Sequence, residues 1–295
     1  MMNKSLTYTA IFEASSLNYG EGTANISELK KFHRGNGDVY TFASRQSMRY
    51  DVVRLGNQLF GWNLNTVDKS KQVIQFKDEV TIKESVEMDL FGYLKTSSNS
   101  QKRPAVARLS HALSLEPYQN DMEFLNNMGL AERINETPNL ANIEQHHSYY
   151  TYTLTVDLNR VGIDGEIELP AEERKKRIEQ LLEILKVLYR DIRGRRENLS
   201  PFFIIGGVYP VSNPFFMGRL RLRKGETGFA IDVEQLKEVA NMTWQGRPVL
   251  DDTVVGCVKG WLTNEEELND AFAGKVYSVD QAFTILKEEA GKVYG

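Results

Sequence analysis

Cysteine is nearly absent from this chain of 295 residues, which contains only Cys257. A single thiol cannot form an intramolecular disulfide or supply a four-cysteine zinc site, so the sequence favours a reducing compartment. No apolar run approaches the roughly 20 residues that a membrane-spanning helix needs. The first 17 residues also lack the charged-then-apolar layout of a signal peptide. We therefore expect a globular, cytoplasmic protein with no membrane partner.

Sequence patterns of common enzymes are missing as well. The chain has no phosphate-loop pattern, no Gly-x-Ser-x-Gly elbow and no His-Glu-x-x-His. Its four histidines lack metal-ligand spacing, and we interpret the pair His146-His147 as a solvated loop pair. None of the 40 acidic residues stands in a recognisable acid/base pattern. We expect no catalytic residue, no metal and no cofactor.

Charge is small overall and uneven along the chain. The net charge is −4, yet residues 30–54 carry +4 and residues 190–224 carry +6, which leaves −14 for the remainder. A basic strip on an acidic body suits a protein that binds an anion along one face. Charged residues that merely solvate the surface are the alternative, and charge alone does not separate the two.

Hydrophobic periodicity predicts an α+β fold. Strands are expected at 5–14, 72–94 (two strands), 105–115, 148–158 and 202–208, and helices at 45–60, 170–193 and 279–286. This order, strand–helix–strands–helix–strand, is typical of a ferredoxin-like sheet with helices on one face. Such a sheet needs about a third of the chain, so the remainder must be insertions.

Two segments between these elements are polar. Residues 119–147 are long and rich in asparagine, which indicates a functional projection or disorder. Residues 96–103 form a shorter polar linker.

The start of the 45–60 helix carries the clearest binding pattern. Arg45 and Arg49 lie one turn apart, with Gln46 between them, at the positively polarised end of a helix capped by Ser44. Two guanidinium groups, an amide and free backbone N–H groups can hold successive phosphates. The alternative is that both arginines pair with Asp51 or with glutamates of a neighbouring element.

Two further patterns stay open. The pair Gly206-Gly207 indicates either close approach of a nucleic-acid backbone or a strand bulge. An alternating run places Arg219, Arg221 and Arg223 on one face of a predicted strand. These arginines are either a row that follows phosphates or the charges that protect an edge strand.

Several short motifs resemble a known family when taken in order. They are Asn18-Tyr19-Gly20-x-Gly22, then Lys30-Lys31, then Ser44-Arg45-Gln46-Ser47-x-Arg49-Tyr50, Asp89-Leu90-Phe91-Gly92, Ser114-Leu115-Glu116-Pro117 and the glycine pair after the long helix. Together they resemble the DevR-like CRISPR-associated proteins, the crRNA-binding backbone subunits of type I Cascade complexes.

The resemblance implies an RNA-recognition-motif-like (RRM-like) palm spanning 1–295 with insertions. These are 61–104 (strands and a mobile loop), 119–147 (a thumb hairpin) and 225–295 (C-terminal additions). It also implies partners: crRNA, target DNA through guide pairing, further copies of the chain and other Cascade subunits, with subtype I-B expected.

Site residues follow from the same resemblance. The RNA-binding candidates are Arg45, Gln46, Arg49, Lys30, Lys31, His33, Asn18, Gly206, Gly207, Arg219 and Arg221. In the thumb, Met122, Phe124, Leu125 or Met128 is expected beside a displaced base. Related type III subunits cleave RNA with a loop aspartate, and Asp38 and Asp121 lie in predicted loops. The type I resemblance implies no cleavage. A ferredoxin-like interaction protein without nucleic acid is the remaining alternative.

Overall fold

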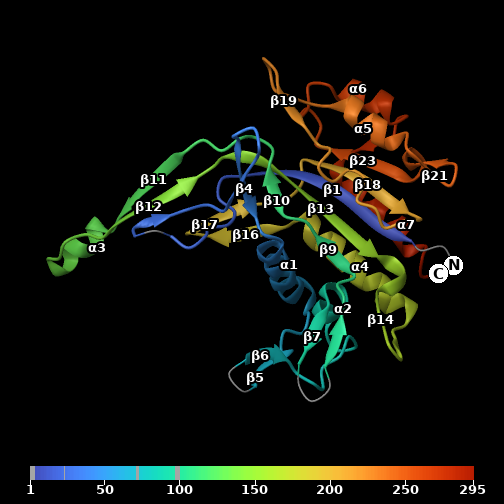
Figure 1. The fold of residues 1–295 in the computed structure, drawn as a ribbon, viewed down its shortest axis with the longest axis horizontal. Coiled ribbons are helices and arrows are strands. Elements are labelled where there is room, and N and C mark those ends of the chain that lie inside the picture. The colour runs from blue at the N-terminus through green and yellow to red at the C-terminus, as the bar shows by residue number, and fades with distance from the viewer. Residues whose placement is uncertain (1–3, 23, 71–72, 97–99) are drawn as a thin grey trace.

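The computed structural model describes residues 4–22, 24–70, 73–96 and 100–295 and confirms a mixed α+β fold (Figure 1). A nine-stranded sheet forms its body, in the order β24-β23-β18-β1-β13-β10-β4-β3, with β9 pairing beside β10 along β13. Its strands are β1 (Ser5–Ala14), β3 (Lys31–His33), β4 (Val39–Ala43), β9 (Ala107–Leu109), β10 (Ala112–Ser114), β13 (Ser148–Asp157), β18 (Phe203–Tyr209), β23 (Thr253–Cys257) and β24 (Val276–Tyr277). All pairings except β23–β24 are antiparallel.

Three helices cover one face of this sheet. Alternation along β1 turns Tyr8 and Phe12 toward α1 (Arg45–Phe60), α4 (Ala171–Lys186) and α7 (Val279–Gly291), and these elements share one core. The chain passes through β1, α1, β10, β13, α4 and β18 in that order.

The opposite face is covered only in part. Phe203 and Ile205 of β18 pack there in a second core with α5 (Val233–Ala240) and α6 (Glu265–Ala271). This second core lies over the β18–β23 half of the sheet, because its sheet residues come mainly from those strands. The β3–β4 end has no such cover among the described residues.

Two insertions extend from the body (Figure 1). The segment 119–147 forms the long hairpin of β11 (Asp121–Asn126) and β12 (Leu140–Gln145), tipped by α3 (Met128–Ala131) and the 3-10 turn η1 (Glu132–Ile134). The strand β2 (Ile26–Ser27) pairs in parallel with β12 near its base. The segment 61–104 contains β5 (Val67–Ser70), β6 (Val73–Phe76), α2 (Val86–Phe91), β7 (Tyr93–Lys95) and β8 (Gln101–Arg103).

The remaining elements are short. They are β14 (Ile163–Asp164), β15 (Ile167–Glu168), β16 (Tyr189–Ile192), β17 (Arg195–Asn198), β19 (Leu222–Lys224), β20 (Phe229–Ile231), β21 (Thr243–Trp244), β22 (Arg247–Pro248) and the 3-10 turns η2 (Leu158–Arg160) and η3 (Val249–Asp252).

Several sequence predictions are confirmed and several are wrong. The strands at 5–14, 148–158 and 202–208 and the helix at 45–60 are confirmed. The helix predicted at 170–193 ends at Lys186, because residues 189–198 turn back as a hairpin through Arg193 and Gly194, both at positive φ. The stretch around Asp89 is helix α2 and not a strand, and the strand at 105–115 is broken in two at Ser110-His111.

The row of arginines at 219–223 is also not a strand face. Arg219 lies in a turn and Arg221 precedes β19, so only Arg223 is in the strand. All three are exposed. The predicted mobile linker at 96–103 includes residues 97–99, which lie outside the described residues.

None of the helices in the described ranges is long and apolar enough to cross a bilayer.

Candidate nucleic-acid interface

The first turn of α1 is fixed by two capping contacts. Ser44 Oγ accepts the Ser47 N–H at 3.1 Å, and Asn18 Oδ1 accepts the Ser44 N–H at 3.1 Å. Asn18 therefore anchors the helix start from the preceding loop. The exposed side chains of Arg45 and Gln46 make no ion pair or hydrogen bond with any described residue.

Arg49 is partly engaged. Its Nη2 lies 2.6 Å from Glu87 Oε1 on α2, and its guanidinium lies 5.3 Å from the centre of the Phe91 ring. The alternative of pairing with a neighbouring glutamate thus holds for Arg49. Asp51 instead pairs with Arg190 and Arg54, at 2.6 and 3.3 Å, and burial raises the pKa of Asp51 although both arginines oppose it.

A groove joins the helix start to strand β9. It has a volume of about 380 Å³ and is lined by Arg45, Gln46, Arg49, Phe91, Ala105, Ala107, Arg108 and Leu109. Three guanidinium groups and an amide thus border one hollow, a composition that suits anionic ligands. We call these four side chains, Arg45, Gln46, Arg49 and Arg108, the arginine groove.

Arg108 was missed by the sequence analysis. It stands exposed between buried Ala107 and Leu109, which is the alternation of a strand and the signal that could have found it. Its Nη1 lies 2.8 Å from Asp157 Oδ2. Arg108 and Leu109 also line a second hollow of about 530 Å³ with Ser110, Thr153, Thr155, Asp157, Ser212, Pro214 and Met217. The two hollows therefore adjoin across β9.

The lysines of the glycine-rich loop differ from one another. Lys31 Nζ lies 2.5 Å from Glu144 Oε2 and 4.8 Å from the centre of the Tyr118 ring, so its charge is neutralised at the base of the hairpin. Burial raises the pKa of Tyr118 there. Lys30 is half-buried and holds β4 through its carbonyl, which accepts the Phe42 N–H. His33 is exposed on β3.

The glycine pair faces the interior of the protein. A Cβ on Gly206 would lie 2.2 Å from Thr7 O, and a Cβ on Gly207 would lie 1.8 Å from Asp252 O. Both glycines are buried in β18. The close approach they permit is to backbone of the same chain, so packing accounts for the pair and we leave it out of the interface.

The second basic segment divides in space (Figure 1). Arg193 and Arg195 lie on the β16–β17 hairpin, where they contact Ser27 and Ser16. Arg219 and Arg221 lie beside β19, far from that hairpin. The basic residues of segment 190–224 therefore do not form one continuous strip.

The hairpin presents apolar side chains to solvent. All six residues of β11 are exposed, including the predicted Met122, Phe124 and Leu125, and Met128 is exposed in α3. The ladder pairs Met122 with Glu144 and Phe124 with Asn142, so these two residues share one face, and Leu125 opposite Ala141 belongs to the other.

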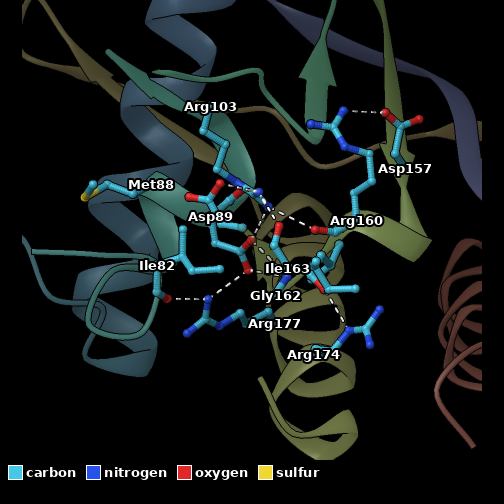
Figure 2. A network of polar contacts seen from close by, with 12 residues as sticks. Ile82, Met88, Asp89, Arg103, Asp157, Arg160, Gly162, Ile163, Arg174 and Arg177 are labelled. Atoms are coloured by element: carbon cyan, nitrogen blue, oxygen red, sulfur yellow. Dashed lines mark hydrogen bonds and ion pairs between the residues drawn. The ribbon is translucent and has the colours of Figure 1, made fainter. Parts of the chain in front are cut away.

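A buried ionic network fixes the 61–104 insertion to the body (Figure 2). Asp89 Oδ1 lies 2.7 Å from Arg103 Nη2, and Asp89 Oδ2 lies 2.8 Å from Arg177 Nη1. Both carboxylate oxygens also accept the Gly162 N–H, at 2.9 and 3.0 Å. The network joins α2, β8 and α4, and so holds Phe91 and Glu87 of α2 at the arginine groove. Arg103 is therefore a buried structural residue and not part of a surface linker.

Potential catalytic groups are spread out. In the described ranges, no three His, Cys, Asp or Glu side chains cluster closely enough to hold a metal ion. Asp38 accepts hydrogen bonds from Asn36 Nδ2 at 2.7 Å and Tyr40 Oη at 3.3 Å, and Asp121 opens strand β11 rather than lying in a loop.

Comparison with known proteins identifies related chains. A family model described as "CRISPR-associated negative auto-regulator DevR/Csa2" matches residues 6–222. A chain of a "CRISPR RNA-guided surveillance complex, pre-nicking" is 14% identical with a TM-score of 0.64, over 97% of this chain and 100% of that one. A chain of a "CRISPR RNA-guided surveillance complex" is 15% identical with a TM-score of 0.55, over 98% and 99%. No curated protein sequence matches.

At these identities, the two solved structures establish a shared fold. The family model covers well over half of the sequence and confirms the resemblance carried by the short motifs. This chain therefore belongs to the DevR/Csa2 family of CRISPR-associated proteins.

Proposed function

We propose that this chain is a non-catalytic backbone subunit of a type I CRISPR Cascade complex, in which it binds the crRNA guide. The arginine groove is the observation that carries the proposal, because it brings three guanidinium groups and an amide from α1 and β9 to one hollow. Family membership and the titles of the two similar structures support the same assignment.

The elements β1, α1, β10, β13, α4 and β18 form the proposed palm. Their chain order and the sheet order β18-β1-β13-β10, with helices on one face, agree with an RRM-like unit. The hairpin at 119–147 is the proposed thumb. Copies of the chain would follow one another along the guide and join other Cascade subunits, in a complex that we assign to subtype I-B.

In the proposed mechanism, the protein binds the phosphates of the guide, and base pairing recognises the target sequence. Guanidinium groups and the N-terminal N–H groups of α1 bind phosphates, which positions the guide without regard to its sequence. Base pairing between guide and target DNA then supplies the sequence recognition. Exposed apolar side chains of the thumb, among them Phe124 and Met122, are available to contact a displaced base.

The double variant Arg45→Ala with Arg49→Ala tests this function. We expect weaker binding of single-stranded RNA of any sequence, because these side chains bind phosphates. The slope of log K against log salt should become shallower by about 0.7 for each phosphate that the variant no longer binds. Fluorescence anisotropy at several salt concentrations measures both quantities.

A matched control removes two arginines elsewhere. Arg196 and Arg247 are exposed and lie outside the groove, so Arg196→Ala with Arg247→Ala should leave the slope near that of the wild type. Equal effects of the two double variants would show that the groove has no special role. Wild-type protein that remains free of RNA after co-expression with a CRISPR array and its partner subunits would favour the interaction-protein alternative.

A cleavage assay tests the non-catalytic part of the proposal. We expect intact target RNA after incubation with guide-loaded protein and Mg²⁺. Cleavage that is abolished by Asp38→Ala or Asp121→Ala would instead establish a type III-like ribonuclease.

A further inference from the structure

Three aromatic rings cluster where the sheet ends. Phe32 of β3 and Phe42 of β4 are stacked, with ring centres 4.0 Å apart and an interplanar angle of 13°. The His111 ring stands edge-on to both, at 5.6 Å from Phe32 and 5.1 Å from Phe42. We call these three residues the aromatic cluster.

The cluster faces outward. Strand alternation turns Thr41 and Ala43 into the core and leaves Phe42 on the other face of the sheet. Phe32 lies on the terminal strand β3 and is 43% exposed, although Phe42 covers part of it. A large apolar ring is thus kept in water at a sheet face that the second core does not cover.

Two cationic residues lie beside the cluster. Lys30 precedes β3 and lies opposite Phe42, and Arg34 follows the end of β3, whereas His33 belongs to the same face of β3 as Lys31. Arg45 comes three residues after Phe42, and Arg108 three residues before His111, so the chain leads directly from two of the three rings to the arginine groove.

Acidic groups near the cluster are already engaged. Asp38 accepts hydrogen bonds from Asn36 and Tyr40, and Arg34 lies 5.9 Å from the Tyr40 ring centre. Glu144 pairs with Lys31, whose side chain belongs to the opposite face of β3 from Phe32. Asp38 keeps its negative charge, and the two cations Lys30 and Arg34 outnumber it around the rings.

A flat apolar group joined to anions matches this surface. A nucleotide of single-stranded RNA has both parts, since its base stacks on aromatic rings and its phosphates bind cations. A hydrophobic protein segment would use the rings but leave the surrounding cations unpaired, so the charge favours the nucleotide.

We propose that the aromatic cluster is a base-stacking site, in which Phe32 receives one nucleobase of the RNA whose phosphates occupy the arginine groove. The site rests on the proposed RNA-binding function and adds to it a contact made to a base rather than to phosphate. Because every base has a flat face, stacking on Phe32 places the base without selecting its identity.

Replacement of Phe32 tests the site. Phe32→Ala should weaken binding of a fluorescein-labelled single-stranded RNA by about 5- to 150-fold, the range measured for removal of one base–aromatic stack. Its salt slope should equal that of the wild type, because no charge is removed. Phe32→Tyr should bind like the wild type, whereas Phe32→Leu, which keeps the apolar bulk and guards against misfolding, should bind weakly.

Phe60 provides a matched control. It is 39% exposed at the end of α1, away from the arginine groove, and Phe60→Ala should not alter RNA affinity. Binding is also measured to a series of RNAs that each lack one base. This series distinguishes base stacking on Phe32 from a purely structural role of Phe32. The nucleotide on Phe32 is the one whose base removal weakens wild-type binding but not binding by Phe32→Ala.

The outcomes separate the two proposals. If the wild type binds RNA with the salt dependence of the arginine groove while Phe32→Ala and Phe32→Leu bind equally well, the stacking site is wrong and the proposed function stands. If the wild type does not bind RNA even in its assembled complex, the proposed function fails and the stacking site fails with it.

Discussion

His146 is a buried histidine at the base of the thumb, so the interpretation of His146-His147 as a solvated pair is wrong for His146 and holds only for His147. Its Nδ1 lies 2.7 Å from Thr41 Oγ1, and its backbone N–H donates to Ser15 O at 2.9 Å. Burial lowers the pKa of His146 below the ordinary 6.5. The folded protein therefore binds a proton at this site less readily than the unfolded chain does.

The sign of the resulting pH dependence follows from this pKa. Stability contributed by neutral His146 is complete above pH 6.5 and is lost as the pH falls below it. We expect the free energy of unfolding to decrease from about pH 7.5 to about pH 5.5, and to decrease less in His146→Asn. Urea unfolding at a series of pH values measures this, and equal slopes in the two proteins would contradict it.

Asp89 is the only carboxylate that we find between two buried guanidinium groups in the described part of the chain. Asp89→Asn removes the negative charge between two buried guanidinium groups. Arg103 then keeps only Asp164, at 3.6 Å, and Arg177 only Glu173, at 3.0 Å, and both of these carboxylates are more exposed than Asp89. Loss of one partner from a buried ion pair typically costs about 3–5 kcal/mol. We expect a decrease of this size in the free energy of unfolding, measured with chemical denaturant.

A surface aspartate provides the control for Asp89. Asp191 pairs with Arg196 in solvent, where ion pairs contribute little, so Asp191→Asn should leave stability unchanged. If Asp89→Asn were no more damaging than Asp191→Asn, the network would not be what fixes the insertion.

At the scale of elements, the thumb is a separate unit of structure. Leu125 and Ala141 lie opposite each other in the β11–β12 ladder, so an Asn-Gly turn can join them in place of residues 126–140. We expect this shortened protein to keep the melting temperature of the wild type, because the removed tip is mostly exposed. Calorimetry measures it, and a loss of several degrees would show that the tip packs on the body.

Local patterns determine which elements were predictable. Helix α1 was found because Met48, Val52 and Leu55 repeat on one buried face, although the fourth member of that stripe, Leu59, is exposed. The end of α4 was missed because Leu188 and Ile192 continue its periodicity beyond Lys186. The positive-φ turn at Gly194 ends that pattern, and glycine was the available signal.

The candidate interface was predictable only where one element carries it. Arg45, Gln46 and Arg49 share a helix face, and the sequence placed them together correctly. Arg108 joins them through the pairing of β9 with β13, which depends on residues far apart in the chain. The same limit applies to Lys31, whose partner Glu144 lies 113 residues away.

At the scale of the whole molecule, the thumb and the 61–104 insertion extend from one sheet (Figure 1). If copies follow one another along the guide as proposed, each copy covers a fixed length of RNA. We expect the mass of complexes assembled on RNAs of increasing length to rise in steps of one chain. Mass photometry measures the steps, and a mass independent of RNA length would contradict polymerisation.

The position of β1 in the sheet has a consequence for how the protein is made. Ser5 pairs with Asp157 on one side and with Tyr209 on the other. At about 5–20 residues per second, a ribosome needs roughly 8 to 30 s to pass from Ser5 to Asp157. During that time the first strand, ten β-prone residues without a proline, has neither of its neighbours. We expect nascent chains that stop before residue 148 to bind chaperones or aggregate. The reason is that β1 can pair with β13 only after residues 148–157 have been made, when translation is more than half complete.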